Sequence, residues 1–248
     1  MKNKTVRISK IISHSGVCSR RDAEELIRKG MVKINDCIFK DYYVDKELIK
    51  NIEVNGKILE KQKTKVWSFY KPKGYVSSNK EQKNQISFFK LIPNNIPRIV
   101  SVGRLDIESE GLLLLTNNPT LSSFLEKPSN EIKRKYRVKV LGKLPKNLKK
   151  VTKETLIING VIYKKLTISV MWKKSLSSYL EIEIKEGKNR EIRKIMTFFG
   201  LKVIELKRIS FGPFELGTLK PGNLEIIKNE KLGKHFQQIG FIDENYFW

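Results

Sequence analysis

The stretch SVGRLDIESEGLLLLTNN, residues 101–118, sets one acidic residue, Asp106, in a polar loop just before an apolar run, Leu112 to Leu115. The run is too short to span a membrane and too uniformly apolar for an exposed helix, so it predicts a buried strand. A buried strand is a rigid support, and the loop before it can present Asp106 to a cleft. Gly103 and Arg104 precede the aspartate and place a cation in the same loop.

The loop aspartate by itself has three interpretations. Many loop aspartates only accept hydrogen bonds within their own turn. Glu108 and Glu110 lie close in sequence, and a pair of carboxylates is what a glycoside hydrolase requires. The surroundings lack the aromatic residues that bind sugar rings. The third interpretation, a catalytic acid for a nucleic-acid substrate, is the one that the charge of the chain favours.

The rest of the second half predicts a sheet with few helices. Hydrophobic periodicity predicts strands over 66–70, 99–102, 136–140, 179–184, 203–209 and 224–227. It predicts a short helix over 87–92 and a longer one over 190–199, ended by Gly200. The polar segment 79–85 is predicted to be a loop, and the polar segment 60–65 a domain boundary.

The first sixty residues predict a small separate module. Ile8, Ile11 and Ile12 form one helical face, and a second helix begins at Ser19, where Asp22 completes a capping box. A strand is predicted over 31–34. The two helices are rich in cations that we expect to bind phosphate: Arg7, Lys10, Arg20, Arg21, Arg28 and Lys29.

Composition narrows the class of partner. The chain has 248 residues, and 50 Lys+Arg against 26 Asp+Glu leave a net charge of +24. Such a positive charge favours a polyanionic partner, although a lysine-rich genome bias would produce the same excess of basic residues without any partner. Two separated cysteines and two histidines predict neither a disulfide framework, nor a metal site, nor a Ser-His dyad. We expect no cofactor, no membrane segment and a cytoplasmic location.

Two family resemblances cover nearly the whole chain. The segment ISKIISHSGVCSRRDAEELIRKGMVKIN, residues 8–35, resembles the S4 RNA-binding domain. The second domain resembles the RsuA/RluB/RluE/RluF family of bacterial ribosomal-RNA pseudouridine synthases. The motifs that carry this likeness, in the family's order and spacing, are KPKG (71–74), GRLDIESEGLLLLTNN (103–118), RKYRVKV (134–140) and EGKNREIRKIM (186–196). The family's T-N-D or T-D-D ending reads Thr116-Asn117-Asn118 here, a difference treated as peripheral.

The resemblance implies a fold, a reaction and site residues. The fold class is α+β: a small N-terminal S4-like (α-L) domain over 5–60, a mixed α/β synthase domain on a mostly antiparallel sheet over 65–230, and a C-terminal tail over 231–248. The reaction is isomerisation of uridine to pseudouridine, by a nucleophilic or a glycal route. Asp106 corresponds to the catalytic aspartate, Tyr136 to the tyrosine that stacks on the base and aids proton removal from C5, and Arg193 to the basic partner of the aspartate. Further RNA contacts are expected from Arg104, Lys71, Arg134 and Arg190.

The expected partner is ribosomal RNA or a pre-ribosomal particle, bound by a monomer without metal. KPKG and the G-L-L-L-L-T run favour the large-subunit (23S) rRNA, with small-subunit (16S) rRNA as the alternative. A noncatalytic assembly factor that binds RNA on the same fold is the competing hypothesis from another class.

Overall fold

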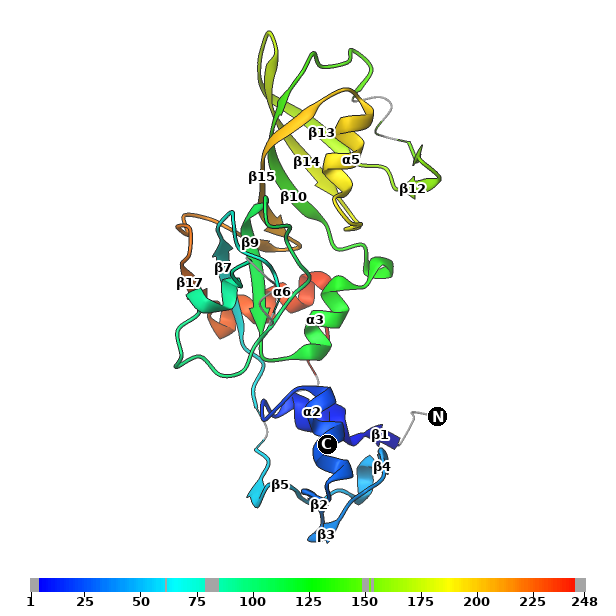
Figure 1. The fold of residues 1–248 in the computed structure, drawn as a ribbon, viewed down its shortest axis with the longest axis vertical. Helices are drawn as coiled ribbons and strands as arrows, with labels where there is room; N and C mark the ends of the chain where they lie inside the picture. Colours follow the sequence, from blue (N-terminus) through cyan, green and yellow to red (C-terminus); the bar gives the residue numbers. More distant parts are fainter. Residues whose placement is uncertain (1–4, 61, 79–84, 149–151, 153, 244–248) are drawn as a thin grey trace.

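The structure, a computed structural model, describes residues 5–60, 62–78, 85–148, 152 and 154–243. Figure 1 shows two parts, a small N-terminal module and a long twisted sheet with helices on both sides. Most of the segment predicted as a loop over 79–85 lies outside the described residues. Within the described ranges, no helix is long and apolar enough to cross a membrane.

The N-terminal module packs two helices against short strands, as the sequence predicts. The helices are α1 (Ile8–His14) and α2 (Arg20–Arg28). The capping box is confirmed, because the Ser19 side chain accepts from the Asp22 N–H while the Asp22 carboxylate accepts from the Ser19 N–H. The strands are β1 (Thr5–Arg7), β2 (Val32–Ile34), β3 (Cys37–Ile38), β4 (Tyr43–Asp45), β5 (Ile52–Val54) and β6 (Lys57–Ile58). A 3-10 turn, η1 (Lys46–Leu48), follows β4, and the sheet order is β3-β2-β5-β6 with a separate β1–β4 pair.

The second part is built on one sheet of order β13-β14-β10-β15-β9-β7-β17. Its strands are β7 (Val66–Lys71), β9 (Glu110–Thr116), β10 (Arg134–Leu141), β13 (Thr167–Lys174), β14 (Ser177–Ile184), β15 (Lys202–Phe211) and β17 (Leu224–Ile226). Short strands β8 (Val100–Ser101) and β16 (Phe214–Glu215) join its edges, and β11 (Leu156–Ile158) pairs with β12 (Val161–Tyr163) as a separate hairpin. All neighbours pair antiparallel except β15 with β9. The α+β fold with a mostly antiparallel sheet is therefore confirmed.

The parallel pair β15–β9 joins the two halves of the sheet at one point. The register sets Lys207 opposite Glu110 and Arg208 opposite Gly111. Gly111 has φ +103°, and a Cβ there would lie 2.3 Å from the carbonyl oxygen of Arg208. The glycine of the E-G-L-L-L-L run is thus required both by its backbone conformation and by the approach of the neighbouring strand.

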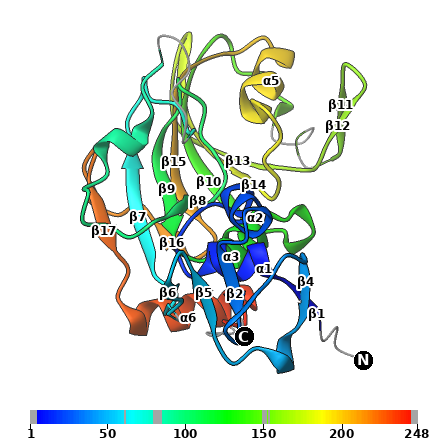
Figure 2. The same cartoon turned by 60° about the horizontal axis from the view of Figure 1, so that its bottom comes forward.

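The apolar run of β9 is buried on both faces, which explains why it does not alternate. Leu113 and Leu115 belong to the core under α5 (Glu191–Phe198), whereas Leu112 and Leu114 belong to the core under α3 and α6. Helix α3 spans Pro119–Glu126 and α6 spans Asn229–Ile239. Figures 1 and 2 show α5 beside β10, β13 and β14, well away from α3 and α6. Two further 3-10 turns are η2 (Phe88–Leu91), where a short helix was predicted, and η3 (Pro128–Asn130).

The segment predicted as a C-terminal tail over 231–248 is corrected by α6. Leu232 and Phe236 are buried with Phe241 in the core that α3 also covers. The rings of Phe241 and Phe124 lie 5.2 Å apart, centroid to centroid. The apolar side chains give this helix a core-facing stripe, so it belongs to the second domain. Tyr246 and Phe247 of the predicted tail lie outside the described residues.

The Thr116-Asn117-Asn118 ending, treated as peripheral on sequence, holds the segment between the two parts. Asn117 Oδ1 accepts from Lys65 N at 2.7 Å, and its Nδ2 donates to Lys63 O at 3.0 Å. The Asn118 side chain caps α3 and donates to Thr64 Oγ1 at 2.8 Å. A further bond joins the parts directly, between His14 Nε2 and Thr120 Oγ1 at 2.9 Å.

Candidate active site

A cleft of about 840 Å³ lies beside the parallel strand junction, and residues from three of the four synthase-like motifs line it. Its walls are the 103–109 loop, the start of β10 and the 186–191 segment at the start of α5. Asp106 and Tyr136, which are thirty positions apart in the chain, both line it. The sheet brings them together because β10 and β9 both pair with β15.

Asp106 lies in a turn that the rest of the loop closes. The Ser109 N–H donates to the Asp106 carbonyl at 3.0 Å. The Asp106 side chain remains about one third exposed, so a substrate can reach the carboxylate. Its nearest cation is Arg190, whose Nη1 lies 3.9 Å from Oδ2. At that distance the guanidinium provides compensating positive charge while leaving the carboxylate open to the cleft.

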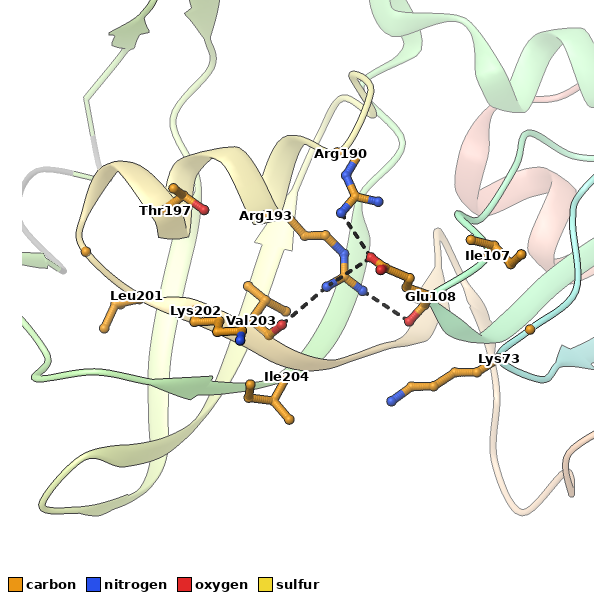
Figure 3. A pocket seen from close by; sticks show the side chains of 12 residues that line it. Lys73, Ile107, Glu108, Arg190, Arg193, Thr197, Leu201, Lys202, Val203 and Ile204 are labelled. Atoms are coloured by element: carbon orange, nitrogen blue, oxygen red, sulfur yellow. Dashed lines mark hydrogen bonds and ion pairs between the residues drawn. The ribbon is translucent and has the colours of Figure 1, made fainter.

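The expected ion pair between Asp106 and Arg193 is not among the described contacts within 4 Å, although the charge of Asp106 acts on Arg193. Arg193 instead donates from Nη2 to the Glu108 carbonyl at 3.1 Å and from Nη1 to the Val203 carbonyl at 3.4 Å. Figure 3 shows Arg190 and Arg193 both pointing at Glu108, which Arg190 Nη2 meets at 3.0 Å. The hydrogen bond from Arg190 holds the pKa of Glu108 below its usual range, and the charges of both arginines add to the effect. Arg193 therefore fastens the Asp106 loop to β15, and Arg190 is the arginine nearest the aspartate.

Lys71, expected to contact RNA, is buried instead. Its side chain has no exposed surface. Its Nζ donates to the carbonyls of Pro72 (3.0 Å), Asp106 (3.1 Å) and Ser109 (2.9 Å). Burial lowers the pKa of Lys71 to about 8, against an opposing effect of the Asp106 charge. From its buried position, Lys71 thus supports the Asp106 loop, and its ammonium cannot reach a phosphate.

Arg134 is also largely buried, although it lines the cleft. Its guanidinium lies 4.7 Å from the centre of the Phe211 ring, a cation–π contact. A Cβ on Gly187 would lie 2.4 Å from Arg134 Nη1, so the arginine side chain lies close against this glycine. Arg134 therefore locks two motifs together, R-K-Y-R-V-K-V and E-G-K-N-R, and the expectation of an exposed phosphate contact is corrected.

Tyr136 occupies an inward position of β10, where its ring is 7% exposed. The neighbouring Arg137 is exposed and Lys139 half-buried on the other face, as the alternation predicts. The tyrosine thus forms part of the cleft floor. Asp106, Tyr136 and Arg190 meet in one place, whereas Arg104 is exposed on the rim of the same cleft.

Three buried charged residues of the cleft were missed on sequence: Glu186, Glu191 and Arg208. Arg208 donates from Nε to the Leu112 carbonyl at 2.7 Å, and its buried Nη2 has no partner among the described residues. Hydrophobic periodicity placed Arg208 in a predicted strand, but it did not mark this arginine as a residue of the cleft. The signal that could have found it is Gly111, whose missing side chain makes room for the Arg208 backbone.

The cations of the N-terminal module divide into two groups. Arg20, Arg21 and Arg28 lie exposed on α2. Arg7 pairs with Glu24 at 3.2 Å and lies over the rings of Tyr42 and Tyr43, and Lys29 pairs with Glu25 at 2.7 Å. Lys10 is half-buried on α1. The exposed arginines of α2 are therefore the members of the predicted phosphate-binding set that the structure leaves most accessible.

A second hollow, of about 940 Å³, adjoins the cleft behind Arg190 and Glu108 (Figure 3). Lys73 and Lys202 lie on its rim, and Ile107, Val203 and Ile204 form apolar walls. Ile107 and Arg190 line both hollows, whereas Glu108 lines only the second.

Comparison with known proteins identifies the family of this chain. Residues 65–197 match the RNA pseudouridylate synthase family model. The chain is 42% identical over 229 residues to a Rickettsia felis protein named an uncharacterized RNA pseudouridine synthase, covering 92% of this chain and 99% of that one. It is 36% identical over 222 residues to the ribosomal large subunit pseudouridine synthase B of Bacillus subtilis, covering 88% and 90%. The crystal structure of a pseudouridylate synthase shares the fold, with a TM-score of 0.66 at 23% identity over 93% of this chain and 99% of that one. With its sheet, its cleft and these relatives, the chain is a member of the RNA pseudouridine synthase family of the RluB/RsuA type and an enzyme that acts on RNA.

Proposed function

We propose that the protein isomerises one uridine of large-subunit ribosomal RNA to pseudouridine, with Asp106 as the catalytic residue. The observation that carries the proposal is the meeting of Asp106, Arg190 and Tyr136 in one open cleft. The names of the Bacillus subtilis relative and of a Buchnera aphidicola relative, 36% identical over 239 residues, support the large-subunit substrate.

The reaction breaks the bond between C1′ and N1, turns the uracil, joins C5 to C1′ and removes the proton from C5. A carboxylate serves either as nucleophile at C1′ or as base at C2′, and the exposure of Asp106 to the cleft is consistent with both routes. The Arg190 guanidinium stabilises negative charge on Asp106 before attack. Tyr136 offers the ring face against which an extruded uracil stacks, and stacking on an aromatic side chain contributes about 1–3 kcal/mol.

The basic surface provides the rest of RNA binding. The target uridine has to leave its stack, which costs a few kcal/mol, so contacts outside the cleft must hold the RNA. The exposed Arg104 lies on the rim, and Arg20, Arg21 and Arg28 lie on the N-terminal module. We expect these arginines to bind phosphates, because the N-terminal module resembles a domain that recognises RNA by shape and backbone.

The test is the Asp106→Asn variant, assayed by release of tritium from RNA that carries 5-tritiated uridine. The expected result is loss of tritium release with RNA affinity unchanged, because the amide fills the same space without the charge. Glu110→Gln is the matched control, since Glu110 accepts from the Tyr70 hydroxyl at 3.1 Å and makes no contact with Asp106 in the described interactions. Full product from Asp106→Asn would overturn the assignment, and free uracil as the product would show hydrolysis instead.

A further inference from the structure

The 186–191 segment that carries Arg190 is held in an unfavourable backbone conformation. Arg190 has φ +51° and ψ +33°, in the left-handed region that residues with a side chain rarely adopt. Arg190 comes directly before α5, and its own side chain caps nothing. The contacts around the turn must therefore hold Arg190 toward Asp106.

Two acidic side chains hold this turn from inside. Glu191 accepts from the Lys188 backbone N–H through Oε2 at 2.9 Å. Glu186 accepts from the Lys164 backbone N–H at 2.8 Å and from the Lys188 ammonium at 3.1 Å. The Lys188 ammonium also bonds the Ile162 carbonyl, which ties the turn to β12. Both acids are more than nine-tenths buried.

One oxygen of Glu191 has no hydrogen-bond partner. Its Oε1 is buried and lacks a donor among the described residues. A bare, ionised oxygen in that place is unfavourable, whereas a protonated carboxyl is neutral and can donate its proton to the Glu186 carboxylate, with which Glu191 shares a side-chain hydrogen bond. The charged groups that act on Glu191 are Glu186 and Lys188 from the turn and Arg134 from β10.

The surroundings of Glu186 and Glu191 favour protonation of Glu191 rather than of Glu186. Burial raises the pKa of Glu191 to about 7, the Lys188 N–H opposes this rise and the charge of Glu186 adds to it. Burial also acts on Glu186, but the hydrogen bonds from Lys164 and Lys188 outweigh it and hold the pKa of Glu186 below its usual range. Near neutral pH, Glu186 is thus ionised and Glu191 exchanges its proton.

We propose that Glu191 is a positioning residue that holds Arg190 against Asp106 only while Glu191 is protonated. Loss of the proton sets two carboxylates against each other inside one turn. The turn then loosens, and Arg190 leaves its place 3.9 Å from Asp106. The inference rests on the proposed role of Asp106, and it makes isomerisation depend on a buried group that acts through Arg190.

The test compares Glu191→Gln with the wild-type enzyme at saturating RNA. The glutamine amide reproduces the protonated acid: it accepts from Lys188 and stays neutral. We expect the wild-type kcat to fall about 25-fold between pH 6.5 and 8.5, with KM unchanged, and the Gln variant to keep its kcat across this range. Glu181→Gln is the control, because Glu181 pairs with Lys135 at 3.6 Å on the other face of the sheet.

A second measurement does not depend on turnover. In the free protein, the side-chain carboxyl carbon of Glu191, identified by its absence from the spectrum of Glu191→Gln, should titrate near pH 7 by carbon-13 NMR. The Arg190 guanidinium signals should shift in the same pH interval. A wild-type pH profile that the Gln variant reproduces, a Gln variant inactive at every pH, or a Glu191 carboxyl that titrates in the usual range would overturn the inference. Absence of isomerisation by the wild type would instead overturn the proposed function.

Discussion

Replacing Lys71 by methionine separates the two roles that this residue has been given, phosphate contact and support of the Asp106 loop. Methionine fills nearly the same volume without charge or donors. The change leaves the carbonyls of Pro72, Asp106 and Ser109 without the ammonium that they share. The Ser109 contact is buried, whereas the other two are partly accessible, so water replaces the lysine at two of the three positions.

The expected loss of stability follows from this difference. One buried carbonyl left without its donor lowers the free energy of unfolding by about 1–3 kcal/mol. Replacing the buried ammonium also removes its desolvation cost, which offsets part of this loss. We expect a net loss of about 2 kcal/mol, which lowers Tm by about 6 °C in a chain of this size. The loop relaxes at Asp106, and a displacement of about 1 Å at a reacting group costs about a hundredfold in kcat.

Thermal unfolding followed by circular dichroism, tritium release at saturating RNA, and RNA affinity over a salt series are the three assays. Lys73→Met is the matched control, since Lys73 belongs to the same motif but is exposed on the rim of the second hollow. Lys73→Met should leave Tm unchanged. It should reduce the steepness of the plot of log binding constant against log salt concentration by about 0.9. If Lys71→Met shows that control phenotype, with Tm and kcat intact, the supporting role of Lys71 is refuted.

Three further changes test the strand junction, the linker and the RNA surface. Gly111→Ala should lower the free energy of unfolding, measured in urea, by about 4 kcal/mol. The new methyl group overlaps the Arg208 carbonyl, and residue 111 has a positive φ. A loss below about 1 kcal/mol would contradict the close approach of the two strands. Asn117→Leu should speed tryptic cleavage after Lys63 and Lys65, since it removes the hydrogen bonds that hold the segment, and an unchanged cleavage rate would show that these bonds do not hold it. Arg21→Ala should weaken rRNA binding and reduce the salt slope by about 1, whereas an unaltered slope would remove this arginine from the phosphate contacts.

Local patterns in the sequence were sufficient for the elements near the site. The capping box at Ser19 and Asp22 depends only on two residues three positions apart, so the sequence is sufficient to predict it, and the structure confirms it. The run Leu112 to Leu115 indicated a buried strand, and the alternation of 136–140 and 179–184 indicated strands with one polar face. The run could not show that two different cores cover β9, since that depends on helices as far as α6, more than a hundred positions away.

Charged residues were predicted less well, because a charged side chain is assigned to the surface by its type alone. Lys71 and Arg134 were expected to meet RNA, yet both are buried and hold backbone or rings in place. Arg193 was chosen over Arg190 as the partner of Asp106. The two arginines are three positions apart, and the left-handed backbone of Arg190 decides which one faces the carboxylate.

The stretch 101–118 by itself determined that a carboxylate would stand in a loop before a buried strand. What surrounds that carboxylate was decided only by the tertiary structure. Asp106 and Tyr136 line one cleft because β15 pairs with β10 on one side and with β9 on the other, and the segment before α5 adds Arg190. Hydrophobic periodicity is a local property of the chain, whereas the burial and pairing of a charge depend on strands that are distant in sequence and adjacent in space.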